Sequence, residues 1–514
     1  MFRFIILTSL FFIPFLSFSQ DSPEKFGPEQ TWHLLDLEED SIYGVSVNKA
    51  YRNLIHFDQN NNITVAVIDG DLDVNHEDLK NRLWVADRNA ASKYKNIKHG
   101  WNFLATSEGD MITKVGSEAF REYKRLRPKY EGKEKEDFKK KRDREEFEYF
   151  EKVKKDAKIQ GYLNFFPIIE LTFDAFRITD SLLREEGVYS ENLSLAEIKN
   201  FQVADSSFQE YVDAAKRSLI QYQEEKPWHE VFESQKKEYD MAVERIKSLD
   251  NTSNPRDSIG DNADKLSDKY YGSAVLVDST SSHGTLVAGL IAAERNNNIG
   301  IDGVAEQARI MGIRAVPDGD EFDKDVALAI RFAVDQGAKI INMSFGKPYS
   351  PNHKWVDKAI KYALKKNVLL VQAAGNDNHN IDSVALYPQP YIKKKKNAHL
   401  IIGASTKKGS KADFSNYGEE QVDFFAPGSK ILSTKLGDEY MKASGTSFSA
   451  PIVSGVAALV WSQHPQLKAY QVADILKESA RKNEVEELKG KAAIPGIVNA
   501  YDALEIAKEY VEKN

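Results

Sequence analysis

The stretch "SGTSFSAPIVSGVAALVW", from Ser444 to Trp461, places a cluster of hydroxyl side chains directly ahead of a run of small and apolar residues. Such a run predicts a buried helix, and the hydroxyl cluster marks where that helix begins. Pro451 is expected to pre-set the first turn of the helix. Ser447 has two interpretations here, because a serine at a helix start either caps the helix or acts as a nucleophile.

Short β-branched runs recur through much of the remaining chain, and segments of helix length separate several of them. The predicted strands cover residues 63–69, 308–316, 338–344, 368–375 and 398–405. Continuous apolar strands that alternate with helices indicate an α/β fold, in which a mostly parallel sheet lies between helices. Active sites of such folds lie beyond the carboxyl ends of the strands, so the polar residues that end these runs are the candidates for chemistry.

Three polar residues stand at the end of a predicted strand or at the start of a predicted helix. Asp69 ends the first strand, Asn376 follows the fourth, and His283 precedes a small-residue helix in "SSHGTLVAGLIAAE". Each has an ordinary structural interpretation: Asp69 and Asn376 as turn residues, His283 as a cap or core histidine. Together with Ser447, Asp69 and His283 match a triad in which histidine takes the serine proton and aspartate orients the imidazole. A nearby amide, such as that of Asn376, can donate to the developing oxyanion.

The chain order Asp…His…Ser differs from that of α/β-hydrolases and chymotrypsin-like enzymes and is the order found in subtilisin. On its motifs the chain resembles the subtilisin-like serine peptidases, the subtilases. The motifs that carry this resemblance are "VAVIDGDLDVNHEDL", "HGTLVAGLIAA", "INMSFG", "AAGNDN" and "SGTSFSAPIVSGVAAL". The resemblance implies a subtilisin-like three-layer fold and an endopeptidase that cleaves polypeptides through an acyl-enzyme.

The resemblance also implies a role for each matched residue. Asp69 would be the acid, His283 the base, Ser447 the nucleophile and Asn376 the oxyanion donor. The substrate-binding residues that it implies are Ser344, Phe345, Gly346, Ala374 and Gly375. No cofactor is expected for this chemistry.

The chain departs from the family pattern after the aspartate, where Gly70 and Asp71 replace a small hydroxyl residue and glycine. A second carboxylate beside Asp69 is expected to raise one pKa or to disturb the orientation of His283. This departure keeps an alternative open, namely a catalytically weak subtilase-fold protein that binds polypeptides. Leu386 stands where a small residue would leave the specificity pocket open, so a shallow pocket is expected.

The middle of the chain has a different composition. About two thirds of residues 121–160 are charged, with both signs mixed and aromatic residues recurring, which predicts a long solvated helix with a narrow packing stripe. Ser194 and Glu197 predict a capping box. We therefore divide the chain into a signal peptide (1–19), a first catalytic part (20–108), an inserted all-α module (109–258) and a second catalytic part (259–514). Because Asp69 and His283 must meet, the ends of the module are expected to lie close together.

Composition limits the remaining possibilities. The chain has 514 residues, no cysteine and a net charge of −8, so disulfides and thiol chemistry are excluded and no nucleic-acid partner is expected. Structural calcium is a weaker hypothesis, with Asp78 and Asn297 as candidate ligands and a plain polar turn as the alternative. We expect a monomer whose partners are polypeptide substrates.

The N-terminal stretch "MFRFIILTSLFFIPFLSFSQ" has one arginine, an apolar run and then small residues, the pattern of a signal peptide cleaved before Gln20. A membrane anchor is the alternative, although the apolar run is short for a membrane span. The expected location is therefore periplasmic or secreted, without stable membrane insertion after cleavage.

Overall fold

The computed structural model describes residues 25–55, 61–87, 94–222, 226–250, 255–278, 281–389 and 397–513. Its centre is a 7-stranded sheet with the strand order β2-β4-β1-β6-β7-β8-β9, in which every neighbouring pair is parallel. The strands are β1 (Ile63–Asp69), β2 (Gly100–Asn102), β4 (Ala308–Arg314), β6 (Ile340–Met343), β7 (Leu369–Ala373), β8 (His399–Ser405) and β9 (Phe424–Pro427). The predicted parallel α/β sheet is confirmed.

Helices cover both faces of this sheet, which gives the expected three layers. One core cluster packs α9, α12, α13, α14 and α2 on one face, and a second packs α10 and α11 on the other. These helices are α2 (Val47–Asn53), α9 (His283–Ala292), α10 (Asp323–Asp335), α11 (His353–Lys365), α12 (Thr446–Gln463), α13 (Ala469–Lys482) and α14 (Ala500–Lys513). Strands covered on both faces carry apolar residues at consecutive positions, which explains the unbroken runs seen in the sequence.

Short elements complete the body of the molecule. They are α1 (Leu37–Asp40), the hairpin of β10 (Ile431–Lys435) and β11 (Glu439–Ala443), and the 3-10 helices η1 (Trp32–Leu34), η2 (Lys80–Arg82) and η7 (Glu486–Leu488). The predicted signal peptide and its cleavage point lie outside the described residues. Among the described residues, no helix has both the length and the apolar character needed to cross a membrane.

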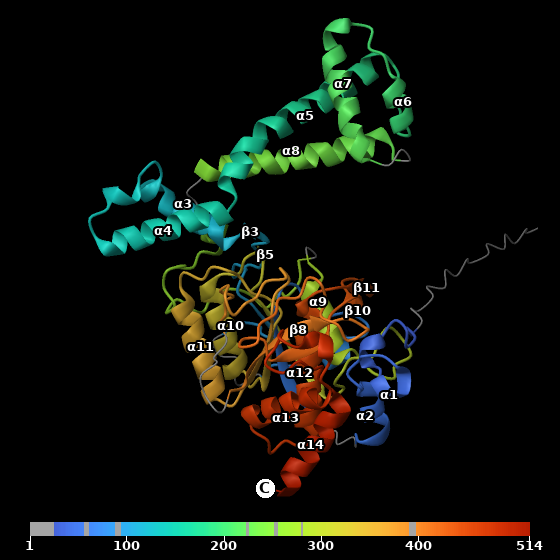
Figure 1. Ribbon diagram of the computed structural model, residues 1–514, viewed down its shortest axis with the longest axis vertical. Coiled ribbons are helices and arrows are strands. Elements are labelled where there is room, and N and C mark those ends of the chain that lie inside the picture. Colours follow the sequence, from blue (N-terminus) through green and yellow to red (C-terminus); the bar gives the residue numbers. More distant parts are fainter. Residues whose placement is uncertain are drawn as a thin grey trace, which may run out of the picture.

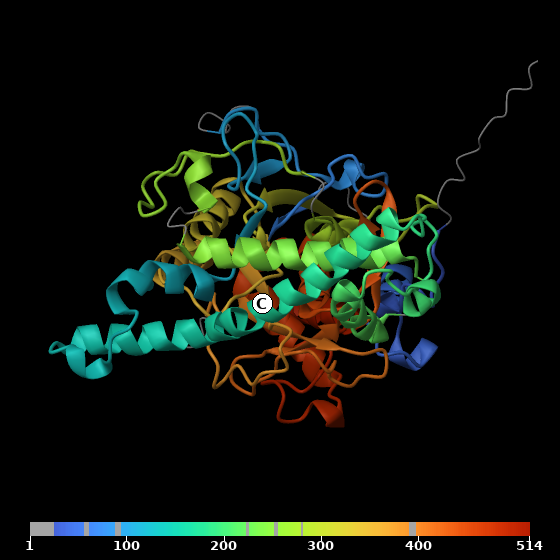
Figure 2. The same ribbon diagram turned by 90° about the horizontal axis from the view of Figure 1, so that it is seen from above.

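A helical arm stands off the body on the side of β3 (Lys114–Gly116) and β5 (Asp318–Gly319) (Figure 1). Seen from above, the helices of the arm lie across the body (Figure 2). Its helices are α3 (Glu118–Tyr130), α4 (Lys141–Asp156), α5 (Ile159–Glu185), α6 (Leu195–Asn200), α7 (Gln209–Ser218) and α8 (Trp228–Asp250), with the 3-10 helices η3 (Lys135–Asp137), η4 (Ser206–Phe208) and η5 (Leu219–Gln221). The predicted capping box of Ser194 and Glu197 is confirmed at the start of α6. The arm has its own apolar cores, one around α3 and α4 and one around α5 to α8.

Two details of this region differ from the sequence-based expectation. The single long helix predicted over residues 121–160 is divided into α3 and α4, because the chain turns between them at Gly132, whose φ of +73° favours glycine. The first residues of the predicted all-α module also contain a strand, since β3 pairs in parallel with β5 of the body.

The two connections between arm and body lie side by side. Ile112 and Val115 from the first connection pack with Ile259 from the second in one small apolar cluster, against Phe322. The guanidinium of Arg121, from α3, lies 4.5 Å from the centre of the Phe322 ring, and that of Arg256 lies 5.1 Å from it. One aromatic side chain of the body therefore contacts a cation from each end of the arm.

Arg256, in the 3-10 helix η6 (Pro255–Ile259), anchors the second connection. Its side chain is only 1% exposed and forms ion pairs with the buried carboxylates of Asp325, at the start of α10, and Asp261. Lys324 donates to Asp261 from the same turn of α10. Burial alone would lower the pKa of Arg256, but these carboxylates raise it, so the buried guanidinium stays charged.

We expect Arg256→Leu to destabilise the protein by about 3–5 kcal/mol, because it leaves the buried carboxylate of Asp325 without its cation. Urea titration followed by circular dichroism measures the change. Arg177→Leu is the control, since Arg177 forms an exposed pair with Asp174 and its loss should leave the midpoint nearly unchanged. Equal midpoints for the two variants would contradict the anchoring role of Arg256.

Candidate active site

Asp69 and His283 come from neighbouring elements at the carboxyl edge of the sheet. Asp69 is the last residue of β1 and is 2% exposed, and His283 is the first residue of α9. The imidazole Nδ1 of His283 lies 2.6 Å from Oδ1 of Asp69, although the two residues are 214 positions apart in the chain. The His283 side chain is 36% exposed, so the imidazole can be reached from solvent while its partner is buried.

This contact controls the charge of the histidine. Burial by itself lowers the pKa of His283, but the negative charge of Asp69 and the hydrogen bond to it outweigh burial and raise the pKa. The imidazolium that forms when His283 takes a proton is therefore stabilised by Asp69.

The start of α12 lies beside the imidazole. The ring of Phe448 is 6.0 Å from the ring of His283, and Ser447 precedes Phe448 as the second residue of the helix. The Ser447 hydroxyl donates to the main-chain carbonyl of Ser344 at 3.1 Å. Among the hydrogen bonds of the described residues, this is the one that the Ser447 hydroxyl donates, and none joins it to His283.

Ser344 and Ser447 are joined a second time, in the opposite direction. The Ser344 hydroxyl donates to the main-chain carbonyl of Ser447 at 2.9 Å. Pro451 is the sixth residue of α12 and does not open the helix, so the expected role in the first turn is wrong. Because proline has no N–H, it cannot donate to the carbonyl four residues earlier, which is that of Ser447, and Ser344 supplies the donor instead.

Asn376 lies in the loop after β7 and is oriented by α12. Its side-chain Oδ1 accepts from both the main-chain N–H of Thr446, at 2.8 Å, and the Thr446 hydroxyl, at 2.9 Å. With Oδ1 engaged, the amide Nδ2 remains as the donor of this exposed side chain. The Thr446 hydroxyl also accepts from the N–H of Gly375, so one threonine positions both residues of the loop.

Asn416, in the sequence "FSNYG" at residues 414–418, is a positioning residue that the sequence analysis missed. Its amide donates to the carbonyl of Ala374 and its Oδ1 accepts from the N–H groups of Asp377 and His379. Gly375 has a φ of +96°, and a Cβ there would lie 2.3 Å from Nδ2 of Asn416. The loop that carries Asn376 therefore requires glycine at position 375.

The residues expected to bind substrate lie at the ends of β6 and β7. Ser344 and Phe345 are buried after β6, and Ala374 is buried after β7. A Cβ on Gly346 would lie 3.0 Å from Cδ1 of Leu386, so the Leu386 side chain lies directly against the backbone of this segment. The shallow specificity pocket expected from Leu386 stays a prediction.

Asp71 does not face His283. Its carboxylate accepts from Nε of Arg314, the last residue of β4, and the same guanidinium donates to Asp278 at 2.7 Å. Burial and a hydrogen bond with the Asp278 carboxyl raise the pKa of Asp71, against the opposing effect of Arg314. The expected pKa rise therefore occurs, but burial and Asp278 cause it, and His283 keeps its contact with Asp69.

The carboxylate of Asp78, one of the two candidate calcium ligands, is fully buried and accepts from protein donors. Asn297 donates its amide to Oδ1 at 2.7 Å, and the N–H of Ile301 donates to Oδ2 at 3.0 Å. Burial raises the pKa of Asp78 to about 6. Calcium requires six to eight oxygen ligands, so its binding here would require these donors to move. The described residues contain no cluster of three or more histidine, aspartate or glutamate side chains suited to a metal, and the calcium hypothesis stays a prediction.

The site thus combines a carboxylate-bound imidazole, a serine at a helix start and an oriented amide at one edge of a parallel sheet. Residues 60–493 match the model of the subtilase family, peptidase S8, and the chain belongs to this family. Thermitase from Thermoactinomyces vulgaris is 34% identical over 249 residues, which cover 47% of this chain and 83% of that protein. Subtilisin BL from Lederbergia lenta is 35% identical over 221 residues, which cover 43% of this chain and 76% of that protein.

Longer relatives match over part of their length. The thermophilic serine proteinase of Bacillus sp. (strain AK1) is 41% identical over 184 residues, and the match spans 36% of this chain and 43% of that protein. Among solved structures, the prenylagaramide maturation protease PagA has 32% identity and a TM-score of 0.39, with 45% of this chain and 84% of that chain covered.

We expect Asp71→Asn to lower stability by about 1–3 kcal/mol, because it replaces a buried carboxyl that accepts from Nε of Arg314 with a neutral amide. Differential scanning calorimetry measures the shift in melting temperature. Asp110→Asn, at an exposed position, is the control and should not shift it. A melting temperature equal to that of the control would show that Asp71 contributes nothing through Arg314.

Proposed function

We propose that this chain is an exported serine endopeptidase that hydrolyses polypeptides through an acyl-enzyme. The observation that carries the proposal is the 2.6 Å hydrogen bond between His283 and Asp69 beside the helix start that bears Ser447. In this mechanism the Ser447 hydroxyl turns from the Ser344 carbonyl to His283, which takes its proton as Ser447 attacks the peptide carbonyl. Asp69 holds the imidazole and stabilises its cation.

The later steps use the same residues. Nδ2 of Asn376 donates to the oxyanion, a role that its occupied Oδ1 supports. His283 returns the proton to the leaving amine, and water then cleaves the acyl-Ser447 ester by the reverse sequence. The segments 344–346 and 374–375 bind the substrate backbone on either side of the cut.

A polypeptide-binding protein with weak catalysis is the second candidate. The observation that favours it is the hydrogen bond of Ser447 to Ser344 in place of His283. The position of Asp71 against Arg314 removes the main sequence-based argument for it. Export remains part of the first proposal and is supported by the N-terminal pattern of residues 1–19, and the monomeric state stays a prediction.

We expect a fluorophosphonate probe to label the purified chain, and Ser447→Ala and His283→Ala to abolish labelling. The probe reacts only with an activated serine, and loss of one triad member lowers turnover by about 10⁴–10⁶-fold. Fluorescence of the labelled band measures the reaction. A folded wild-type chain that stays unlabelled, with or without calcium, would favour the binding protein.

The labelling rate should rise with pH through the pKa of His283, because only neutral imidazole accepts the serine proton. Since Asp69 raises this pKa, the inflection should lie above that of an ordinary histidine. Asp69→Asn removes the charge that raises it, so the inflection should move to lower pH while the rate falls by about 10⁴-fold. An inflection that Asp69→Asn leaves in place would assign the titration to another group.

Leu386 should restrict the pocket to small side chains before the cut. We expect Leu386→Gly to raise kcat/KM for succinyl-Ala-Ala-Pro-Phe p-nitroanilide, relative to the alanine analogue, by about 10–100-fold. Release of p-nitroaniline measures both rates. Val384→Gly, which changes an exposed side chain nearby, should leave the ratio unchanged. An unchanged ratio in Leu386→Gly would place the pocket elsewhere.

A further inference from the structure

Lys347 is a buried cation at the end of the predicted substrate-binding segment. It follows Gly346 directly and its side chain is 2% exposed. Its main chain exchanges two hydrogen bonds with Tyr387, at 3.0 and 2.8 Å, and Tyr387 follows Leu386. Lys347 therefore joins the two stretches that line the expected pocket, so the position of its side chain bears on both of them.

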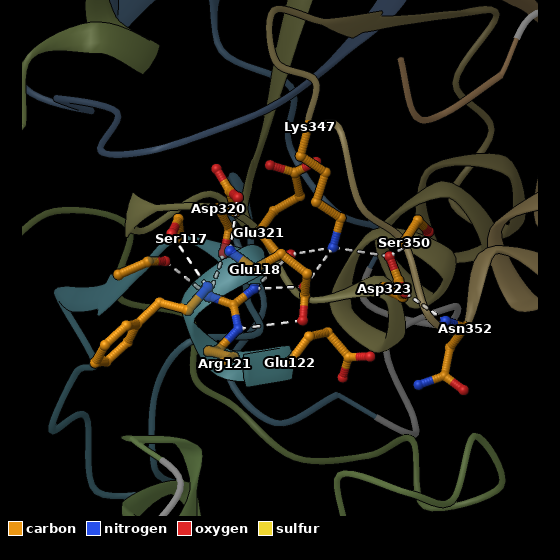
Figure 3. Close-up of polar contacts among 12 residues, drawn as sticks. Ser117, Glu118, Arg121, Glu122, Asp320, Glu321, Asp323, Lys347, Ser350 and Asn352 are labelled. Carbon is orange, nitrogen blue, oxygen red and sulfur yellow. Dashed lines mark hydrogen bonds and ion pairs between the residues drawn. The ribbon is translucent and has the colours of Figure 1, made fainter. Parts of the chain in front are cut away.

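The partners of its ammonium group come from the arm as well as from the body (Figure 3). Nζ of Lys347 lies 2.8 Å from Oε2 of Glu118, in the first turn of α3, and 2.9 Å from Oδ1 of Asp323, in the first turn of α10. It also donates to the carbonyl of Glu321 at 2.6 Å. Burial would lower the pKa of Lys347, but Glu118 and Asp323 raise it, so the ammonium stays charged inside the protein.

Glu118 is itself held in place by the loop that contains β5. Arg121 donates to Oε2 of Glu118 at 2.6 Å and to the carbonyl of Asp320 at 2.9 Å. The N–H of Glu118 donates to the carboxylate of Asp320 at 2.7 Å. The first turn of α3 thus bonds to main-chain and side-chain groups of the body, and its residues Glu118, Ala119 and Phe120 are buried.

Asp323 fixes the other side of the cluster. Its carboxylate accepts from the Ser350 hydroxyl and from the N–H of Asn352, each at 2.7 Å, in the chain that continues from Lys347. Lys347 is therefore held between α10 of the body and α3 of the arm. Loss of Glu118 would leave the buried ammonium with Asp323 as its ion-pair partner and the carbonyl of Glu321 as its other acceptor. Removing one carboxylate from a buried ammonium is costly, and movement of the segment 344–347 would relieve that cost.

We propose that Glu118 is a positioning residue for substrate binding. In this proposal the first turn of α3 supports the segment of the body that binds the substrate. Glu118 acts through the ion pair with Lys347, which holds the segment Ser344–Gly346 in place. This inference rests on the proposed peptidase function. The proposal gives the first turn of α3 a role that is separate from that of the distal helices α5 to α8.

A double-mutant cycle tests the proposal in the full-length chain. The variants are Glu118→Gln, Lys347→Met and both together, assayed with succinyl-Ala-Ala-Pro-Ala p-nitroanilide. We expect each single variant to raise KM about tenfold, with kcat lowered by less than about threefold. The double variant should be no worse than either single variant, because both changes break the same pair.

Glu122→Gln is the matched control. Glu122 lies in the same helix, is also buried and pairs with Arg125 of that helix, so the substitution removes the same charge without touching Lys347. KM should equal the wild-type value in this variant. KM values for Glu118→Gln and Lys347→Met that also equal the wild-type value, or single effects that multiply in the double variant, would overturn the proposal.

A binding measurement separates this proposal from the peptidase proposal. Fluorescein-labelled casein is titrated into Ser447→Ala, with and without Glu118→Gln, and fluorescence anisotropy gives Kd. We expect Glu118→Gln to raise Kd about tenfold, even if the wild-type chain proves inactive. If Glu118→Gln does not fold, the Lys347→Met variant tests the proposal in its place. In Lys347→Met the carboxylate of Glu118 still pairs with Arg121, and no buried ammonium is left without a partner. An unchanged Kd in folded Ser447→Ala/Lys347→Met would overturn the proposal.

Discussion

The hydrogen bond between His283 and Asp69 closes a loop of 214 residues, and the rest of the structure has to accommodate that closure. The entropic cost of closing a loop grows only slowly with its length, so a large insertion between the two residues is tolerable. The geometry at its ends is the stricter requirement, because a displacement there would move the imidazole away from Asp69. Pairing of β3 with β5 and packing of Ile259 on Ile112 and Val115 bring the two ends together.

The two connections between arm and body are held largely by buried ion pairs. The ion pairs of Lys347 and those of Arg256 both involve residues in the first turn of α10. Asp323 faces the Lys347 cluster, while Lys324 and Asp325 face Arg256 and Asp261. Buried ion pairs add little net stability compared with apolar packing, but an unpaired member is costly. A shift of the arm would leave several buried charges unpaired at once. The ion-pair network therefore favours one orientation of the arm over slightly different orientations.

Asp69, His283 and Ser447 could be placed from the sequence, because each stands at the end of a strand or the start of a helix that its neighbours in the chain define. Asp69 ends an apolar strand, and His283 and Ser447 begin small-residue helices, so the topology of a parallel sheet brings them to one edge. The strands β1, β4, β6, β7 and β8 could be predicted to within two residues at each end for the same reason, since a strand buried on both faces leaves a continuous apolar run. The short edge strands β2 and β9 were not predicted.

The long-range partners could not be placed in this way. Glu118 lies 229 positions from Lys347, and nothing in the charge-rich sequence around Glu118 distinguishes it from its solvated neighbours. Arg314 gave a usable signal, because an arginine within an apolar strand implies a buried carboxylate partner. Residues 131–140 separate α3 from α4 in a stretch whose composition favours helix, and a prediction from average composition does not register the single glycine at which the chain turns.

Pro451 makes the helix that carries Ser447 dependent on another part of the chain. A helix ordinarily completes its own hydrogen bonds as it grows, but α12 has no N–H to offer the Ser447 carbonyl and takes its donor from Ser344. Ser344 reaches that carbonyl only once β6 has joined the sheet. During folding, therefore, the turn around Ser447 is completed by assembly of the core and not by helix formation, and a partly folded chain lacks the finished serine turn.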